Sequence, residues 1–304
     1  MALLQSVKQN ALVRFLLNFS FKKINPSVIS YRIITSPKYL YFRRMLYYIP
    51  QKKYSDLKLS DRAEQWMKEI KENGIVKIEN EFEGLAEYLD KEYFSNPNCK
   101  YILEDQTVPR TQAMGITLAM HISFRDSVLA KLFFHEEILG MLSKHYKCQA
   151  YYRNLPSIIE NKYDATKHTQ DMQALFHLDK GLDQISIMFL VKDLSENDTH
   201  MQYSMGSNKE KHKTVDRFKF DQDLIEKKYP IMKCIGKAGT VFIFRAGMGF
   251  HRGFQVSGST RKILHLNVTS GHDLFHQEYD KISDFNHLEN KKFFVKKSIE
   301  KIVK

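Results

Sequence analysis

The spacing of hydrophobic positions changes near the middle of the chain, from a helical pattern to a strand-like one. Apolar residues recur every three or four positions over residues 61–70 and again over 125–145, which predicts two amphipathic helices. Asp61 and Glu64 resemble a capping box at the start of the first helix, and Asn73, followed by glycine, marks its end.

The second half of the chain shows short runs rich in β-branched and aromatic residues, separated by Gly, Asp, Asn and Ser. Together with one run after the first helix, the predicted strands span residues 75–79, 149–153, 184–191, 240–245 and 262–269. Helices followed by a series of short strands indicate an α+β fold, or a β-barrel buttressed by helices.

Residues 1–55 combine basic and bulky apolar side chains and contain no acidic residue. One helical face from Leu4 to Phe19 is apolar except for Lys8. Such a helix could lie in a membrane interface, cap the core of the domain, or belong to a mitochondrial transit peptide. Arg14 interrupts any apolar run long enough for a secretory signal. The lack of acidic residues favours the membrane interface.

The net charge of +12 is concentrated at the two ends of the chain. Residues 1–55 carry +10 and residues 289–304 carry +4, which leaves residues 56–288 nearly neutral at −2. We therefore divide the chain into a basic amphipathic arm, a central domain and a basic tail at these boundaries. Basic ends on a neutral body suit an anionic surface better than a nucleic-acid groove, so no nucleic-acid partner is expected.

The composition is that of a globular protein, with 43% hydrophobic and 27% charged residues. No run approaches the roughly 18 apolar residues of a membrane-spanning helix. Cys99, Cys148 and Cys234 are widely spaced and form no CxxC motif, which argues against a disulfide framework or a thiolate zinc site. A reducing compartment is therefore expected.

The residues that point to chemistry are His177 and Asp179, just before a predicted strand, and His251, just after another. In an extended segment, residues two apart face the same side, so His177 and Asp179 can present a nitrogen and an oxygen to one point. With His251 they make two histidines and one carboxylate, the facial arrangement of non-haem iron(II) oxygenases. Arg261, ten residues later, could bind a carboxylate through both guanidinium nitrogens.

Four segments, in order, resemble the phytanoyl-CoA dioxygenase family of Fe(II)/2-oxoglutarate-dependent oxygenases. They cover roughly residues 70 to 275, and the last is the most specific. The segments are NGIVKIEN (73–80), LFHLDK (175–180), VKDLSENDTHMQYSMGSNKEKH (191–212) and GKAGTVFIFRAGMGFHRGFQVSGSTRKILHLNVTSG (236–271).

The resemblance implies a double-stranded β-helix, a jelly-roll or cupin-like barrel, buttressed by helices and flanked here by the basic helical arm and tail. It implies that His177, Asp179 and His251 bind Fe(II) and are catalytic, and that Arg261 binds the distal carboxylate of 2-oxoglutarate. O2 is the second co-substrate, and ascorbate is a further candidate cofactor. The implied reaction decarboxylates 2-oxoglutarate oxidatively to succinate and CO2 while a substrate is hydroxylated.

Several positions depart from the family pattern. Asp198 stands in place of a turn glycine, Met205 replaces a proline, Asn208 replaces a histidine and Leu178 replaces a polar residue. These changes remove no metal ligand, but they make the substrate of the namesake family a poor guide. Asp179 itself indicates a hydroxylase, since halogenating relatives lack a carboxylate there.

Other histidines receive structural interpretations. His265 and His272 are read as structural or surface groups, and His135, which lacks the second histidine of a zincin motif, as part of a solvated helix face. His168, His200 and His212 are read as loop residues. The polar stretches 154–172 and 200–235 are predicted to be long loops that select the substrate.

The function predicted from the sequence is hydroxylation of an aliphatic C–H in a small-molecule, lipid-linked or glycan-linked substrate, by a cytoplasmic enzyme held peripherally on an anionic membrane. The alternative function is a catalytically silent barrel that serves as a membrane-associated binding or scaffold module. The alternative location is the mitochondrion, reached by import through the N-terminal arm.

Overall fold

The computed structural model describes residues 52–96, 116–122, 124, 126–148, 150–152, 156–166, 174–179, 184–210 and 220–270. The chain divides into two units, Met1–Ile49 and Pro50–Lys304, and every described residue belongs to the second. The predicted arm, up to residue 51, and the predicted tail lie outside the described residues.

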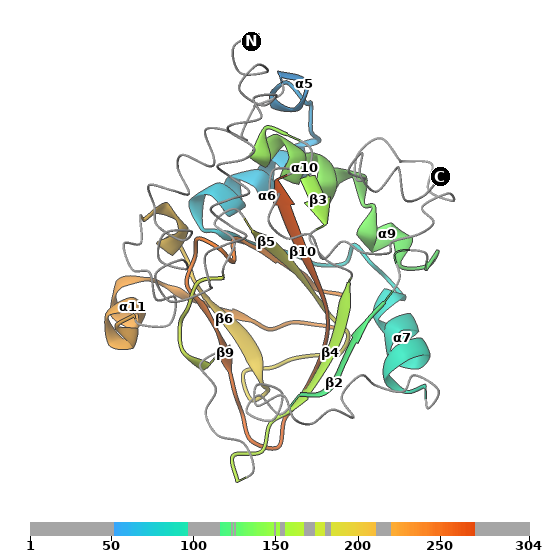
Figure 1. Ribbon diagram of the computed structural model, residues 1–304, viewed down its shortest axis with the longest axis vertical. Coiled ribbons are helices and arrows are strands. Elements are labelled where there is room, and N and C mark those ends of the chain that lie inside the picture. The colour runs from blue at the N-terminus through green and yellow to red at the C-terminus, as the bar shows by residue number, and fades with distance from the viewer. Residues whose placement is uncertain are drawn as a thin grey trace, which may run out of the picture. The chain divides into compact units, whose positions relative to one another are not determined.

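Short helices and strands alternate along the described chain (Figure 1). The helical segments are α5 (Lys52–Ser55), α6 (Asp61–Glu72), α7 (Leu85–Leu89), η1 (Asp90–Phe94), α9 (Ala130–Phe133), α10 (Glu136–Tyr146), η4 (Ser207–Lys209) and α11 (Gln222–Lys228). The strands are β1 (Ile75–Ile78), β2 (Ile116–His121), β3 (Ala150–Tyr152), β4 (Ser157–Lys162), β5 (Ile185–Leu190), β6 (His200–Ser204), β7 (Ile231–Cys234), β8 (Val241–Phe244), β9 (His251–Phe254) and β10 (Thr260–Ser270). Among these described helices, none combines the length and apolar content needed to cross a membrane.

The strands form two antiparallel sheets. The larger sheet has the order β1-β8-β5-β10-β4-β2, with β3 also paired to β10, and the smaller has the order β7-β6-β9. From β5 onward the chain visits the larger sheet at β5, β8 and β10, and the smaller sheet at β6, β7 and β9. Residues 177–179, before β5, and residues 246–251, after β8, are consequently brought together, and backbone hydrogen bonds join them.

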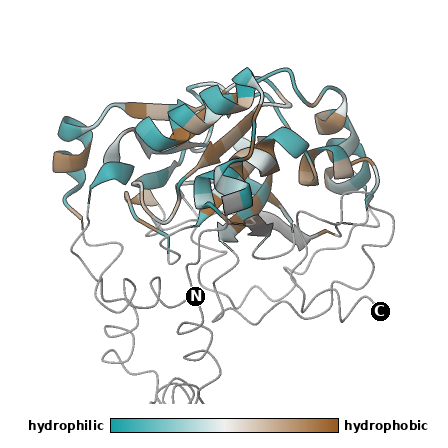
Figure 2. Ribbon diagram, turned by 90° about the horizontal axis from the view of Figure 1, so that it is seen from above, coloured by the Kyte–Doolittle hydropathy of each residue, from teal (hydrophilic) through white to brown (hydrophobic). Residues whose placement is uncertain are grey.

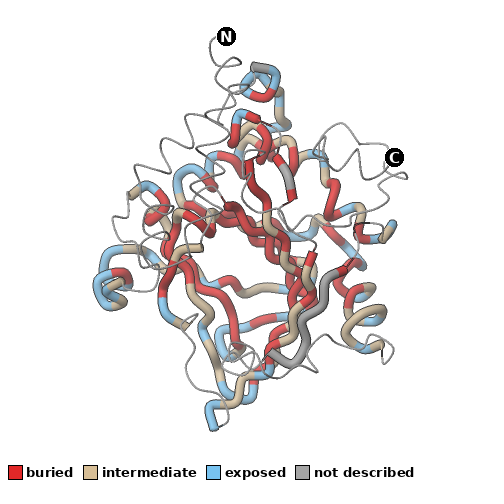
Figure 3. Tube along the Cα trace, in the orientation of Figure 1, coloured by how far each residue is buried: buried red, intermediate tan, exposed pale blue. Residues whose placement is uncertain are grey.

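Side chains of both sheets share one core. Met188 and Phe242 of the larger sheet pack in one apolar cluster with Met201 and Tyr203 of the smaller sheet, so the two sheets lie face to face. Burying each large apolar side chain contributes about 1.5–3 kcal/mol to folding. Figure 3 shows that the central strands are largely buried.

The opposite face of the larger sheet is covered by helices. Trp66 and Ile70 of α6 and Leu139 of α10 pack in a second cluster with Phe189 and Leu264, which point away from the smaller sheet. The helices of the described chain carry both hydrophilic and hydrophobic residues, as an amphipathic pattern predicts (Figure 2). The chain is therefore α+β, with α6 and α10 on one face of the larger sheet and α11 in a separate apolar cluster with Phe176 and Phe250.

The first helix is capped one residue earlier than the sequence analysis predicts. Ser60 is its N-cap, and its hydroxyl accepts a hydrogen bond from the Ala63 N–H at 3.2 Å. The predicted capping box of Asp61 and Glu64 is therefore wrong, because the serine already occupies the capping position. The helix ends at Asn73 as predicted, before a glycine in the left-handed region.

Two other predictions about elements are wrong. The second helix is split into α9 and α10 because His135 adopts an extended backbone (φ −62°, ψ 112°) and acts as the N-cap of α10. The predicted loop 154–172 contains β4, and the predicted loop 200–235 contains β6, η4, α11 and β7. Polar residues in these strands hide the alternation, yet all five residues of β6 are buried.

Candidate metal centre

His177 and His251 lie side by side because the short segment around His177 pairs with the start of β9. The N–H of His177 donates to the carbonyl of His251 at 3.0 Å, and the N–H of His251 donates back at 3.1 Å. Their ring centroids are 4.4 Å apart, and both residues are buried. Backbone pairing between segments more than seventy residues apart therefore sets the relation of the two imidazoles.

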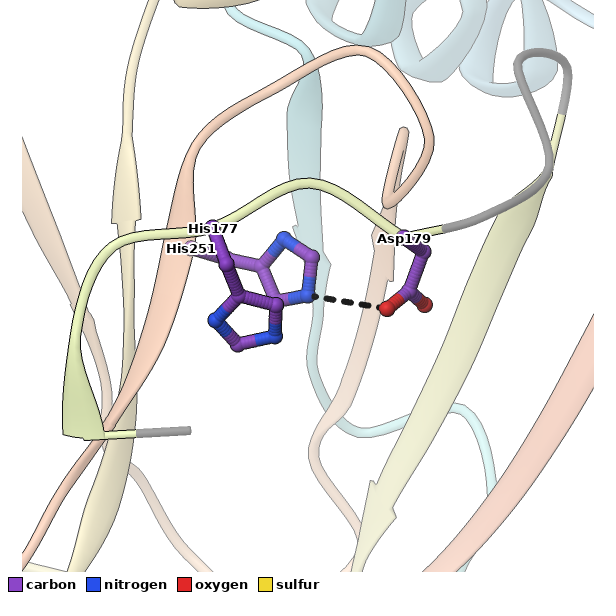
Figure 4. Close-up of side chains that lie close together, drawn as sticks. All are labelled: His177, Asp179 and His251. Carbon is purple, nitrogen blue, oxygen red and sulfur yellow. Dashed lines mark ion pairs between the residues drawn. The ribbon is translucent and has the colours of Figure 1, made fainter. Parts of the chain in front are cut away.

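Asp179 completes the group of three. Its N–H donates to the carbonyl of Ala246 at 2.8 Å, which holds Asp179 beside the loop that leads into β9. Its Oδ1 lies 3.7 Å from Nε2 of His251 (Figure 4). Three ligand atoms, one each from His177, Asp179 and His251, lie within 4.8 Å of one another. The structure thus brings together the three residues that the sequence analysis selected.

The backbone fixes which nitrogen each imidazole presents. Nδ1 of His177 lies 2.8 Å from the carbonyl of Leu175, and Nδ1 of His251 lies 3.1 Å from the carbonyl of Gly249. Since a carbonyl only accepts, each Nδ1 carries the proton and donates it. In the neutral imidazole the lone pair is then on Nε2, which is the form of histidine that binds a metal ion.

The loop between β8 and β9 positions His251. The N–H of Gly249 donates to the carbonyl of Arg245 at 2.8 Å, and the N–H of Arg245 donates to the carbonyl of Gly74 at 2.8 Å. Tyr203 of β6 packs directly against Gly249, so a Cβ at that glycine would overlap the tyrosine hydroxyl. The loop therefore requires glycine at residue 249 for close approach.

Gly249→Ala is expected to reduce the free energy of unfolding by about 1–3 kcal/mol, because the added methyl group overpacks the core at Tyr203. Gly140→Ala is the matched control. Its Cβ would meet Cδ2 of Leu59 at an ordinary 3.4 Å, and alanine in a helix interior stabilises by about 0.5–1 kcal/mol. Urea unfolding of both variants should show opposite signs, and equal effects would contradict the packing described here.

Arg261 lies on β10 and is buried. Its Nη2 and Nε donate to Oδ1 of Asn161 on β4 at 2.9 Å and 3.3 Å. Burial lowers the pKa of the guanidinium to about 10. Among the described residues, no carboxylate forms an ion pair with it. A buried cation without a counter-charge is costly, so this position favours an anionic ligand.

His265 is closer to this region than the sequence analysis predicts. It lies four residues after Arg261 on the same strand, and therefore on the same face. Burial lowers the pKa of its imidazole to about 4, opposed by the charge of Asp179 and reinforced by those of Arg261 and His251. Of the two interpretations of His265, structural or surface, the structural one fits, because the residue is partly buried within electrostatic range of Asp179, Arg261 and His251.

Gln184 is a site residue that the sequence analysis missed. It directly precedes β5, and its Nε2 donates to Oδ2 of Asp179 at 2.7 Å. The same amide contacts Asn267 of β10. Side chains alternate between the two faces of β10, so Asn267 lies on the same face as Arg261 and His265. This alternation is the sequence signal that could have placed Asn267 near the site.

The remaining predicted residues lie elsewhere. His200, read as a loop residue, is buried on β6, and burial lowers its pKa. His168, His212 and His272 lie outside the described residues.

His135 forms a second group with Glu81 and Glu137, and it is partly buried instead of lying on the predicted solvated helix face. Arg62 forms ion pairs with both glutamates. Both carboxylates are therefore already engaged by Arg62, and Glu137 also accepts a hydrogen bond from the hydroxyl of Ser60.

The group of His177, Asp179 and His251 fits a single divalent ion. It offers two imidazole nitrogens and one carboxylate oxygen from one side, which leaves other coordination positions open. Three-ligand open sites suit catalysis, whereas structural sites are closed. Two histidines and one carboxylate are the donor set of non-haem Fe(II) oxygenases.

No family model matches the sequence, and no curated protein matches it. Among solved structures, the chain is similar to the non-heme alpha-ketoglutarate-dependent carbocyclase SnoK from nogalamycin biosynthesis (TM-score 0.48, 14% identity, 70% of this chain and 84% of that chain). It is also similar to EctD from S. alaskensis with 2-oxoglutarate and 5-hydroxyectoine (TM-score 0.48, 13% identity, 71% and 77%). A third is AviO1 from Streptomyces viridochromogenes Tue57 (TM-score 0.47, 10% identity, 70% and 97%). At these values the similarity assigns no family, and the function is inferred from the chain's own residues.

Proposed function

We propose that this chain is an Fe(II)- and 2-oxoglutarate-dependent oxygenase whose iron is held by His177, Asp179 and His251. The observation that carries the proposal is the convergence of these ligand atoms within 4.8 Å, on two imidazoles whose Nδ1 protons are committed to backbone carbonyls. When bound, the ion would supply oxidative decarboxylation of 2-oxoglutarate to succinate and CO2, coupled to hydroxylation of an aliphatic C–H.

The protein's own residues would orient the co-substrate and exclude water. The guanidinium of Arg261 binds the distal carboxylate of 2-oxoglutarate, which supplies the counter-charge that the described residues lack. The ring of Phe244 packs 5.5 Å from that of His251 and shields one side of the ligand from solvent. O2 is the second co-substrate, and ascorbate is a candidate for keeping the iron reduced.

The proposed architecture is a double-stranded β-helix of the kind found in the phytanoyl-CoA dioxygenase family. It is supported by the alternation of β5 to β10 between two antiparallel sheets and by the apolar cluster that both sheets share. The helices on the outer face of the larger sheet would be the buttress.

We further propose that the enzyme is cytoplasmic and peripheral on an anionic membrane, and that its substrate is a small molecule or is linked to a lipid or a glycan. The charge of +10 over residues 1–55 and +4 over residues 289–304 supports this location.

The intact protein is expected to sediment with anionic liposomes, and added salt should weaken this binding without abolishing it. Each Lys or Arg near an anionic leaflet contributes about 1 kcal/mol, and an apolar helix face adds binding that salt does not screen. Residues 1–49 make up the first of the two units, and a chain that begins at Pro50 should bind far less. Failure of the intact chain to bind at low salt would rule out the membrane proposal.

The oxygenase proposal is tested by incubating lipid, glycan and small-molecule fractions with the protein, Fe(II), 2-oxoglutarate and O2. Mass spectrometry should find a species that gains one oxygen in step with succinate formation. The Asp179→Ala protein is the control. Metal binding without any oxidised product or succinate would instead support the silent binding module.

A further inference from the structure

A chain of hydrogen bonds joins Asp179 to the larger sheet. Nε2 of Gln184 donates to Oδ2 of Asp179 at 2.7 Å and to Oδ1 of Asn267 at 2.9 Å. The hydroxyl of Ser186 donates to the same Oδ1 of Asn267 at 2.8 Å. Ser186 and Asn267 are directly paired in the register of β5 and β10, so two central strands anchor the network.

The network allows only one orientation of the Gln184 amide. Nε2 of this amide donates to two acceptor oxygens, Oδ2 of Asp179 and Oδ1 of Asn267. Turning the amide over would place Oε1 against these two oxygens and replace two attractions with two repulsions. Gln184 and Ser186 are also buried, so water does not readily replace the lost bonds.

The two oxygens of Asp179 consequently have different surroundings. Oδ2 accepts the hydrogen bond from Gln184, whereas Oδ1 lies 3.7 Å from Nε2 of His251, toward the other two ligand atoms (Figure 4). An untethered carboxylate can rotate and bind a divalent ion through both oxygens.

We propose that Gln184, fixed by Asn267 and Ser186, is a positioning residue that makes Asp179 a one-oxygen ligand. The inference rests on the proposed metal site. By retaining Oδ2, the Gln184 amide keeps the carboxylate from taking a second coordination position. Three positions then stay open beside the two histidines, as a facial site requires.

The test measures Co(II) binding to the intact chain by calorimetry, together with the visible absorption of bound Co(II), which reports its coordination. Gln184→Met keeps the length of the side chain and removes the donor. Co(II) affinity should fall roughly 10-fold to 100-fold, as for other residues that orient metal ligands, and the absorption should change as the second oxygen binds. A parent spectrum in this variant, whatever its affinity, would overturn the inference.

Gln202→Met is the matched control. Gln202 is as buried as Gln184, at 5% exposure each, but its Oε1 accepts from Nε of Arg252 at 2.9 Å and contacts no proposed ligand. Its Co(II) affinity and spectrum should equal those of the parent. A loss of affinity equal to that of Gln184→Met would mean that both act only through stability, and would overturn the inference.

Two variants of Asn267 test the network without changing Gln184. Asn267→Asp keeps an acceptor oxygen for Gln184 and Ser186 and should retain the parent Co(II) spectrum, whereas Asn267→Leu should shift it as Gln184→Met does. An unshifted spectrum in Asn267→Leu would count against the inference. If instead the proposed metal site itself is wrong, the parent and His177→Ala should bind Co(II) equally weakly.

Discussion

Asp179→Ala is expected to abolish 2-oxoglutarate turnover and to remove high-affinity Fe(II) binding. Asp179 is the only anionic member of the three-residue group, so its loss removes both a ligand and the charge that balances the ion. His177→Ala should have the same effect through loss of one imidazole. Succinate formation from 2-oxoglutarate, measured under air with Fe(II), should fall to the level without enzyme in both variants.

The Asp179→Ala protein should remain folded, because Asp179 is partly exposed and belongs to none of the apolar clusters. Asp193→Ala is a matched control, since that carboxylate forms a surface ion pair with Lys237 at 2.7 Å, of the kind worth little to stability. It should keep parent turnover. Turnover at the parent rate in Asp179→Ala would show that the iron assignment is wrong.

Arg261→Leu is expected to raise the KM for 2-oxoglutarate strongly while leaving the iron ligands intact. Losing one buried charge-assisted pair costs about 2–5 kcal/mol, which corresponds to about a 30-fold to several-thousand-fold rise in KM. The same change should alter the stability of the ligand-free protein little, because it removes a buried cation that lacks a carboxylate partner among the described residues but also the two hydrogen bonds to buried Asn161.

Steady-state kinetics and thermal unfolding without 2-oxoglutarate measure the two effects separately. Arg261→Lys is the conservative control: it keeps the charge but not the planar pair of donors, so its KM should lie between those of the parent and the leucine variant. An unchanged KM in Arg261→Leu, together with a lower unfolding temperature, would mean that Arg261 is structural and that another group anchors the acid.

The strands that the sequence predicts correctly are those whose composition matches their burial. β5 and β8 consist almost entirely of β-branched, aromatic or other apolar residues, because they are covered by helices on one face and by the smaller sheet on the other. β6 was missed because His200, Gln202 and Ser204 alternate with its apolar residues and suggest an exposed face. They are buried by contacts far along the chain, such as that of Gln202 with Arg252, and no local pattern reveals such contacts.

The residues of the candidate site also divide into those that local sequence predicts and those that only the folded sheet brings together. The two-residue spacing of His177 and Asp179 is a local property of extended backbone, so the sequence predicts their convergence. His251 could be added because it follows a clear strand. Gln184 and Asn267 come together only through the register of β5 and β10, across 83 positions of sequence. Register of that kind depends on the whole sheet and is not encoded in any short motif.

The central claim is that this chain binds 2-oxoglutarate through an iron ion held by His177, Asp179 and His251. Its most direct test is an anaerobic calorimetric titration of 2-oxoglutarate into the intact protein, with and without Fe(II), compared with His177→Ala. The account predicts saturable binding at one site per chain that requires Fe(II) and is lost in the variant. Equal binding without Fe(II) or in His177→Ala, or no binding to the Fe(II)-loaded parent, would contradict it.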